Sequence, residues 1–265
     1  ASLCTVHPFT EARDIGWVVH VTTDDDPGRA EALADELAEQ AWRASQTPVP
    51  TFHSPEQAFA LADQAWLARK TGVVSLVDTG DVTTAGATGG STSLLRYLVD
   101  HPPSLVTYLP LHDPAALERL RHHEPGEMVD IQLRGSPGLA DNPVVDCRGK
   151  LLGHHTTATS GRAATVEIGR LELLVTEHPP VTIWPRLFHE VGLDPWKADV
   201  VVVKSLFPFR IFFAPMNRFT LYARTEGITD FDAALREIPW DYPVHPRDEI
   251  ECWRPTDARR RGVAG

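Results

Sequence analysis

The sequence has few cysteines, few basic residues and no long apolar run. Its three cysteines, Cys4, Cys147 and Cys252, lie far apart without CxxC spacing. This pattern excludes a disulfide framework and a zinc ribbon, and it favours a reducing, cytoplasmic location. No apolar stretch approaches the roughly 20 residues that cross a bilayer, and the chain does not open with a basic segment followed by an apolar one. We therefore expect neither a membrane partner nor a signal peptide.

The shortage of positive charge limits the class of ligand. The 265 residues include 25 Lys and Arg against 36 Asp and Glu, which gives a formal net charge of −11. A protein that binds nucleic acid or an anionic membrane would favour a basic face. The composition therefore argues against both partners and favours small molecules or peptides.

Strand-like and helix-like segments alternate in the first half of the chain. The β-branched segment at residues 17–23 leads through an aspartate-rich turn to a helical pattern at 29–44, and a second helix is predicted at 56–70. A further strand is predicted at 73–78. Further along this half, strands are predicted at residues 105–111 and 127–134, and a helix between them at 113–122. Such alternation predicts a parallel or mixed sheet covered by helices.

The pattern changes after Gly138. Short β-like runs separated by Gly, Asn and Pro predict antiparallel hairpins over residues 141–176. A short helix is predicted at 187–191 and a buried strand at 199–204. We therefore predict an α/β fold with a mixed, largely parallel sheet flanked by helices and an antiparallel β-hairpin section in the second half. Residues 1–138 would form the α/β portion and 139–265 a β-rich portion of the same domain.

Residues 73–98 join a strand, a glycine-rich loop and a helix. An apolar run ends at Asp78, and a leucine-rich helical pattern begins after Ser91-Thr92. The free N–H groups of a helix N-terminus and the glycines of the loop let an anion or a carbonyl oxygen approach the backbone closely. The candidate binding residues of this loop are Asp78, Asp81, Gly86, Gly89, Ser91 and Thr92. A tight turn in which Ser91 or Thr92 caps the helix is the alternative.

A second group of candidates follows the valine-rich segment at residues 199–204. Lys204 leaves this predicted strand, and its ammonium group can pair with Asp78 or Asp81 if the two strands are neighbours. An ordinary structural ion pair is the alternative to a binding role. Arg210, between aromatic residues, and His7, before the first strand, complete the candidates. For His7 the alternative is a surface or turn position.

Twelve histidines suggest a metal site, but their spacing does not support one. His189-Glu190 begins like the HExxH motif of zinc peptidases, yet Leu193 stands where the second ligand is required. The pairs His122-His123 and His154-His155 do not supply three convergent ligands. The glycine loop also lacks the last glycine of a serine nucleophile elbow and the Lys-Ser/Thr of a P-loop. We therefore predict no metal ligands within this chain.

Several segments, in order, resemble the C-terminal half of the MlrC-like (M81) metallopeptidases. The glycine loop of that family reads Asp-x-x-Asp and then Gly-Ala-x-Gly-Asp-Ser/Thr, which residues 78–81 and 86–92 match except that Gly90 stands in place of the family's Asp. The further matching segments are residues 14–16 with the strand and acidic turn after them, 174–177, 192–195, 200–210, 214–215 and 243–246. The resemblance covers nearly the whole chain.

The resemblance implies a zinc-dependent hydrolase of small peptides or related amides with a fold about twice as long as this chain. The metal ligands of that family, an Asp-x-His pair and a further His, belong to an N-terminal half that this sequence lacks. The implied cofactor is therefore zinc with ligands outside this chain, and the implied partner is an N-terminal metal-binding domain or subunit. The glycine loop, Lys204 and His7 would orient the substrate. We expect the isolated chain to be inactive.

Two other functions stay open on the sequence. The chain could be a non-catalytic module that binds a small anionic or peptide ligand with the same loop, which the glycine at position 90 favours. An autonomous serine or metal hydrolase would require that mutation of Ser91 or His189 abolishes activity. An upstream segment that carries an Asp-x-His step would favour the enzyme over the binding module.

Overall fold

The computed structural model describes residues 1–265 apart from 7–14, 48–49, 140–141, 231–241, 246 and 261–265. The chain divides into two compact units. Unit 1 combines Ala1–Pro50 with Phe231–Gly265, and unit 2 is Thr51–Asp230. None of the helices in the described part of the chain is both long and apolar enough to cross a membrane.

Unit 1 is built around one long helix. Its described residues form two antiparallel strands and two helices: β1 Ser2–Cys4, β2 Val18–His20, α1 Pro27–Ser45 and α9 Arg254–Arg260. The Asp26 carboxylate accepts a hydrogen bond from the Arg29 N–H at 2.9 Å, and Pro27 occupies the first turn of α1, where it loses no helical hydrogen bond. The helix predicted at 29–44 is confirmed, and the strand predicted at 17–23 is confirmed in a shorter form.

Unit 2 is organised by a nine-stranded sheet. The strand order in the described residues is β3-β11-β4-β10-β5-β9-β8-β7-β6. The bounds are β3 Phe52–His53, β4 Val73–Asp78, β5 Thr107–His112, β6 Met128–Leu133, β7 Val145–Thr157, β8 Gly161–Ile168, β9 Leu171–Thr176, β10 Val200–Val203 and β11 Asn217–Ala223. The pairings from β3 to β9 are parallel, and those among β9, β8, β7 and β6 are antiparallel. The predicted mixed, largely parallel sheet with antiparallel hairpins is confirmed.

The portions expected at residues 1–138 and 139–265 meet between β6 and β7. These two strands are hydrogen-bonded neighbours over six residue pairs, from Met128↔Lys150 to Leu133↔Val145. One sheet therefore continues across that point. A division of the fold there stays a prediction.

Helices cover both faces of the sheet in unit 2. Their bounds are α2 Pro55–Gln64, α3 Trp66–Thr71, α4 Ser93–Asp100, α5 Pro114–Leu120, α6 Arg186–Glu190 and α7 Phe209–Phe212, with the 3₁₀ turns η1 Thr83–Ala85 and η2 Pro195–Lys197. The single helix predicted at 56–70 is wrong, because the chain leaves helical geometry at Ala65 (φ −78°, ψ 40°). The Arg69 guanidinium donates to the carbonyl oxygens of Ala62 and Asp63 at 3.0 and 2.8 Å. It thereby satisfies carbonyl groups that end α2.

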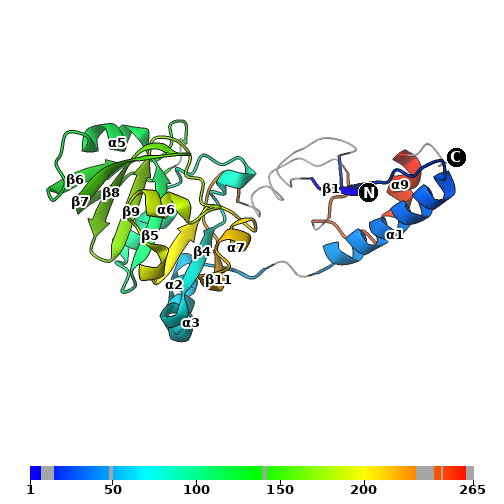
Figure 1. Ribbon diagram of the computed structural model, residues 1–265, viewed down its shortest axis with the longest axis horizontal. Helices are drawn as coiled ribbons and strands as arrows, with labels where there is room; N and C mark the ends of the chain where they lie inside the picture. Colours follow the sequence, from blue (N-terminus) through cyan, green and yellow to red (C-terminus); the bar gives the residue numbers. More distant parts are fainter. Residues whose placement is uncertain (7–14, 48–49, 140–141, 231–241, 246, 261–265) are drawn as a thin grey trace. The chain divides into compact units, whose positions relative to one another are not determined.

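The valine strands alternate between two apolar cores. Val200 and Val202 of β10 pack into the core that contains α2, α4 and α5, whereas Val201 and Val203 pack into the core that contains α6 and α7. Figure 1 shows α6 and α7 in front of the sheet. Because side chains of a strand alternate between faces, a strand covered on both sides must be apolar throughout. This explains the uninterrupted valine run.

The two central strands lead to the same edge of the sheet. Strand β4 is continued by the glycine loop and α4, β10 is continued by Lys204 and α7, and the two strands are parallel neighbours. Ligands of parallel α/β sheets bind outside the carboxyl ends of the strands. We call this side the carboxyl edge, and the candidate site lies there.

Candidate functional site

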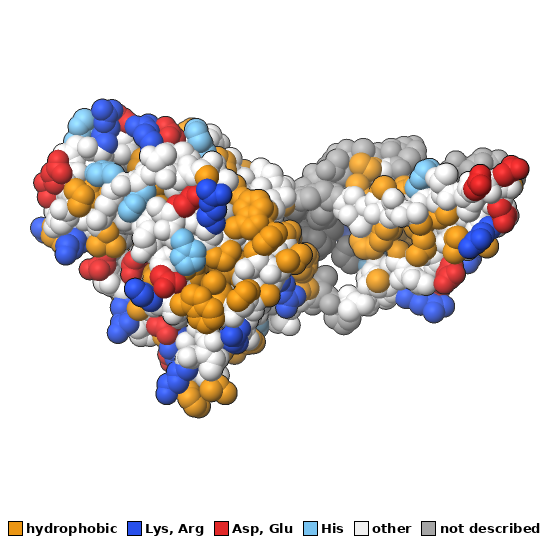
Figure 2. Space-filling model, viewed as in Figure 1, with side chains coloured by type: hydrophobic (Ala, Val, Ile, Leu, Met, Phe, Trp, Pro, Cys, Tyr) orange, Lys and Arg blue, Asp and Glu red, His pale blue; other side chains and the backbone are white. Residues whose placement is uncertain are grey.

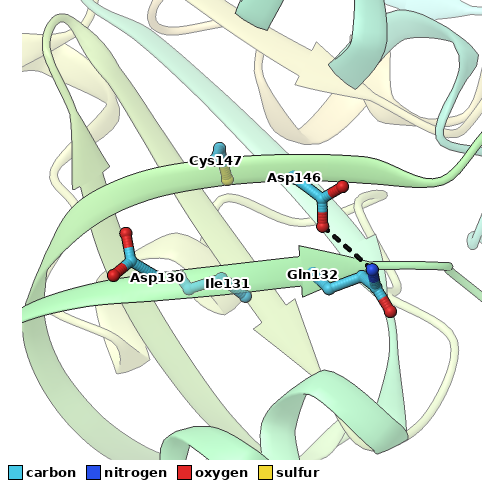
Figure 3. A pocket seen from close by; sticks show the side chains of 5 residues that line it. All are labelled: Asp130, Ile131, Gln132, Asp146 and Cys147. Carbon is cyan, nitrogen blue, oxygen red and sulfur yellow. Dashed lines mark hydrogen bonds between the residues drawn. The ribbon is translucent and has the colours of Figure 1, made fainter.

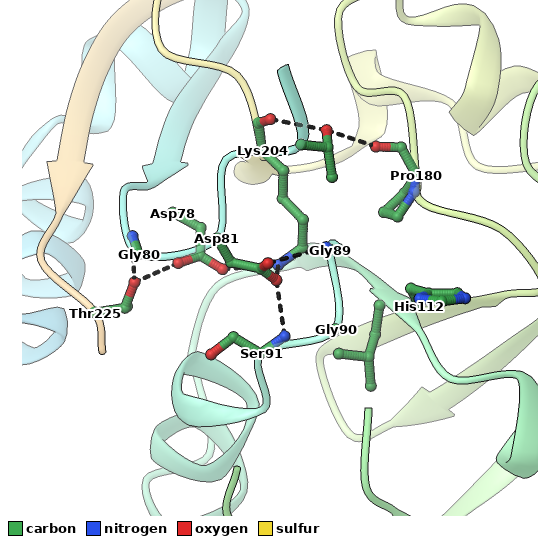
Figure 4. Close-up of polar contacts among 12 residues, drawn as sticks. Asp78, Gly80, Asp81, Gly89, Gly90, Ser91, His112, Pro180, Lys204 and Thr225 are labelled. Carbon is green, nitrogen blue, oxygen red and sulfur yellow. Dashed lines mark hydrogen bonds and ion pairs between the residues drawn. The ribbon is translucent and has the colours of Figure 1, made fainter. Parts of the chain in front are cut away.

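The loop after β4, residues 79–92, is folded around the side chain of Asp81. One carboxylate oxygen of Asp81 accepts the N–H of Gly89 at 2.9 Å, and the other accepts the N–H of Ser91 at 2.8 Å. Both bonds reach across the loop to the start of α4. The strand and the helix predicted on either side of the loop are present as β4 and α4, and Asp81 holds the two ends of the loop together (Figure 4).

Lys204 completes a buried ion triad with Asp78 and Asp81. Its Nζ donates to one carboxylate oxygen of each aspartate at 2.8 Å. The strand register explains this contact, because Val203 of β10 lies beside Val77 of β4 and so places Lys204 beside Asp78. The exposed fractions of the three side chains are 0%, 1% and 2%. The structure thus shows Lys204 paired with both of the aspartates that the sequence offered.

Burial and charge act in opposite directions on Lys204. Burial lowers the pKa of its ammonium group, but the adjacent Asp78 and Asp81 carboxylates outweigh burial and raise the pKa above its ordinary value. Lys204 therefore stays charged. One positive and two negative charges leave an excess of one negative charge, which the N–H donors of the loop partly balance.

Threonine side chains from the C-terminal part of unit 2 complete the support of the loop. The Thr225 hydroxyl donates to Asp78 and accepts the N–H of Gly80 at 2.9 Å. The Thr229 hydroxyl accepts the N–H of Val82 at 2.8 Å and donates to the carbonyl oxygen of Thr79 at 2.9 Å. Sequence reasoning missed both residues. Their role depends on β11 lying next to β4, which no local pattern reveals.

The Gly89-Gly90 turn lies directly against the backbone that follows β6. A Cβ atom on Gly90 would lie 2.3 Å from the N atom of Ser136, and one on Gly135 would lie 1.7 Å from the carbonyl oxygen of Gly90. The Asn142 amide donates to the Gly90 carbonyl at 2.7 Å and accepts the Thr92 N–H at 2.8 Å. Glycine at position 90 is therefore required by a backbone contact.

His112, at the end of β5, is a further residue of the carboxyl edge that the sequence did not single out. Its backbone N–H donates to Gly89 at 2.9 Å. The ring Nε2 lies 3.0 Å from the carbonyl oxygen of Glu177, which can only accept, so Nε2 carries a proton. The ring Nδ1, 2.6 Å from the Ser136 hydroxyl, then accepts from it in the neutral ring. Burial lowers the pKa of His112, in agreement with a neutral ring.

We expect this histidine to make stability depend on pH. The pKa of His112 is lower in the folded protein than in the unfolded chain, so protons bind the unfolded state more readily as the pH falls below about 6.5, and stability is lost there. The variant His112→Asn should lose this part of the pH dependence. Urea unfolding between about pH 7.5 and 5.5 measures it, with exposed His189→Asn as the control. Equal pH slopes for wild type and His112→Asn would contradict the assignment.

The other residues predicted from the sequence lie around the Asp78, Asp81 and Lys204 triad or away from it. Gly86 is at the exposed tip of the loop with φ +100° and open space around it. Thr92 is at the N-cap position of α4, but its hydroxyl donates to Pro143 and makes no capping bond. The Ser91 hydroxyl donates to the Glu226 carbonyl at 3.1 Å. Arg210 is exposed on α7 and is not part of the triad. His7 lies outside the described residues.

The described residues contain no group of three or more His, Cys, Asp and Glu side chains that could hold a metal ion. Glu190, which follows His189, pairs with Arg186 at 2.6 Å and accepts the N–H of Ala158 at 3.0 Å. The two contacts hold Glu190 to its neighbour on α6 and to the turn after β7. The carboxylate of Glu190 therefore stabilises the local fold and is not positioned beside two metal ligands.

One surface cavity lies away from the carboxyl edge, on the hairpin of β6 and β7 (Figure 3). Its volume is about 390 Å³, and its lining residues are Asp130, Ile131, Gln132, Asp146 and Cys147. The Gln132 amide donates to Asp146 at 3.0 Å. Burial, with a smaller effect of the Asp146 charge, raises the pKa of the Cys147 thiol to about 11. Cys147 is therefore protonated near neutral pH and is a poor nucleophile.

Comparison with known protein families shows which family the chain resembles. Residues 76–241 match the family model described as MlrC C-terminus, a span that includes the glycine loop, His112 and Lys204. The chain belongs to the MlrC C-terminus family. The resemblance seen in the sequence is thereby confirmed.

Two relatives of this MlrC C-terminus chain are longer than the chain itself. It is 28% identical over 217 residues to Microcystinase C of Sphingomonas sp, an alignment that covers 78% of this chain and 42% of that protein. It shares its fold, with a TM-score of 0.69 and 21% identity, with a crystal structure from Mesorhizobium sp. BNC1 described as a “Putative metallopeptidase”. That match covers 86% of this chain and 48% of the other. The chain thus spans less than half the length of either relative.

Proposed function

We propose that this chain is the C-terminal part of an MlrC-like zinc metallopeptidase that hydrolyses small peptides or related amides. The observation that carries the proposal is the match of residues 76–241 to the MlrC C-terminus family. The named relatives, Microcystinase C and a “Putative metallopeptidase”, support a metallopeptidase-like function at the level of the family. The cytoplasmic location remains part of the proposal and rests on the cysteine usage.

Zinc in this proposal is held by residues outside the chain. The described side chains do not form a ligand set, so we assign no step of the hydrolysis to them. The chain aligns with 42% of Microcystinase C, which leaves length in that protein for a second, metal-bearing half. We use the term metal-bearing half for the N-terminal domain or subunit that would supply the zinc ligands and complete the site.

The role proposed for this chain is to present the glycine loop on the substrate side. Asp78, Asp81 and Lys204 are buried, so we assign them to holding the loop in one conformation. We assign the same role to Gly89, Ser91 and Thr92, whose backbone N–H groups face inward to Asp81 and Asn142. Of the loop and α7 candidates, Gly86 and Arg210 are exposed and available for direct contact. His7 stays a proposed substrate-orienting residue.

Metal content and activity test the proposal together. We expect the isolated chain, after dialysis against buffer without metal, to retain much less than about one zinc per molecule and to hydrolyse no small peptide, because the carboxylates and imidazoles in the described part of the chain do not converge. The chain joined to the metal-bearing half should bind zinc and hydrolyse the peptide. Metal analysis and a peptide hydrolysis assay measure the two properties, and the metal-bearing half alone is the control. Tight one-to-one zinc in the isolated chain would contradict the proposal.

A non-catalytic binding module is the second candidate. The close contact of Gly90 with Ser136 favours it, because this chain keeps the loop backbone but has no acidic side chain at that position. Such a module would bind a small anionic or peptide ligand without hydrolysis. In the same assay it would bind the ligand yet remain inactive when combined with the metal-bearing half.

A further inference from the structure

Helix α7 and its neighbours expose large apolar side chains. The exposed fractions are 53% for Phe207, 74% for Ile211 and 44% for Phe212. Trp184, 40% exposed, lies against Phe212 with a distance of 5.5 Å between ring centroids. We call these four residues the α7 patch. Figure 2 shows hydrophobic side chains gathered on this side of unit 2.

The exposure does not come from a loosely attached helix. Phe209 and Phe213, on the inner side of α7, are fully buried. Their rings lie 6.0 Å apart, and Phe213 also contacts Phe188 of α6 with ring centroids 6.5 Å apart. The inner face of α7 is thus packed into the core, and its outer face is exposed to solvent. A contiguous apolar surface of this kind marks an interaction site.

The α7 patch lies at the same edge as the glycine loop. Phe207 follows three residues after Lys204, whose N–H donates to the Thr182 hydroxyl at 2.7 Å. Thr182 in turn precedes Trp184. The hydroxyl of Thr83, in the glycine loop, donates to the Pro180 carbonyl at 3.1 Å. The backbone that carries the patch is therefore bonded directly to the loop and to the residue after β10.

The charge within the α7 patch argues against a second copy of this chain as its occupant. Arg210 is exposed between Phe207 and Ile211, and among the described residues its guanidinium forms no ion pair. In a two-fold contact centred on α7, the two Arg210 side chains would approach each other, and like charges in an interface oppose binding. A different surface, apolar and carrying a carboxylate opposite Arg210, fits better.

We propose that the α7 patch is the surface on which the metal-bearing half docks. This inference rests on the proposed function. The length of the relatives suggests what covers the patch. This chain accounts for only 42% of Microcystinase C and 48% of the solved metallopeptidase-like chain, so each relative has a further part that could lie on this surface. Docking there would bury Phe207, Ile211 and Phe212 and would bring the second half to the carboxyl edge, beside the glycine loop.

Hydrogen exchange tests the docking surface without using activity. The metal-bearing half is expressed with this chain, either joined to it or as a separate subunit. Exchange in residues 205–213 and in α3 is compared with that of the chain alone. We expect protection at 205–213 and none at α3. The substitution Ile211→Asp should weaken the association by about tenfold or more, whereas Leu67→Asp, at a site 60% exposed on α3, should leave it unchanged. Urea unfolding of both variants checks that each folds as the wild type does.

Three results would overturn the docking proposal. One is unchanged exchange at 205–213 in the joined protein. Another is an association that Ile211→Asp does not weaken. The third is a dimer of the chain alone that Ile211→Asp dissociates, which would identify a second copy as the occupant. Failure of the proposed function looks different, because the halves would then associate through α7 but contain no zinc and hydrolyse no peptide.

Discussion

Replacing Lys204 with methionine is expected to lower the free energy of unfolding by about 3–5 kcal/mol. Methionine has a similar length but no charge, so Asp78 and Asp81 would be left facing each other in a site with almost no exposure. Neither carboxylate can move to water without opening the loop, since Asp81 also holds the N–H groups of Gly89 and Ser91. The measurement is urea unfolding of wild type and variant at neutral pH.

Two further variants separate the charge from the packing. Lys197→Met changes the same residue type at an exposed position after β9 and should alter stability by less than about 0.5 kcal/mol. Adding Asp78→Asn and Asp81→Asn to Lys204→Met removes the unpaired negative charges and should recover part of the loss. A Lys204→Met protein as stable as Lys197→Met would show that the triad contributes little to the fold.

Much of the fold could be predicted because its strands are covered on both faces. The run that became β10 is apolar at every position and the run that became β4 at four of its six, and both strands are buried throughout, which distinguishes them from the alternating strands of the hairpin section. The interruption of the predicted helix at Ala65 could not be predicted in the same way. It depends on Arg69, which turns back to the carbonyls of Ala62 and Asp63 and also binds Asp199 at 3.0 Å. The last contact depends on the position of β10.

The candidate site shows the same limit. The pairing of Lys204 with Asp78 and Asp81 could be anticipated from two strand ends, on the condition that the strands are neighbours. The threonine, histidine and asparagine that support the loop could not, because Thr225, His112 and Asn142 reach it only through the strand order β11-β4-β10-β5 and the turn after β6. Local patterns predict elements, whereas these contacts follow from how the elements are ordered in the sheet.

Replacing Gly90 with aspartate, the residue that the family's loop pattern carries, is expected to destabilise this chain. A Cβ at position 90 would lie 2.0 Å from the Ser136 hydroxyl and 2.3 Å from its backbone N. A side chain can rotate away, but the backbone of residues 135–136 cannot, because Asp113 accepts the N–H of Gly135 at 2.8 Å. Overpacking of this kind costs about 1–3 kcal/mol, and a buried carboxylate without a cation adds to that cost.

Comparison with alanine and with the loop tip distinguishes the causes. Gly90→Ala should show the steric cost alone, about 1–3 kcal/mol, and Gly90→Asp should exceed it. Gly86→Asp places the same side chain in open space at φ +100°, where only the left-handed backbone opposes it, at about 1–2 kcal/mol. If urea unfolding finds Gly90→Asp no less stable than Gly86→Asp, the turn at 135–136 yields to the side chain. The loop of this chain could then accept the acidic residue of its family, and the absence of that residue would have to be explained by function instead of by packing.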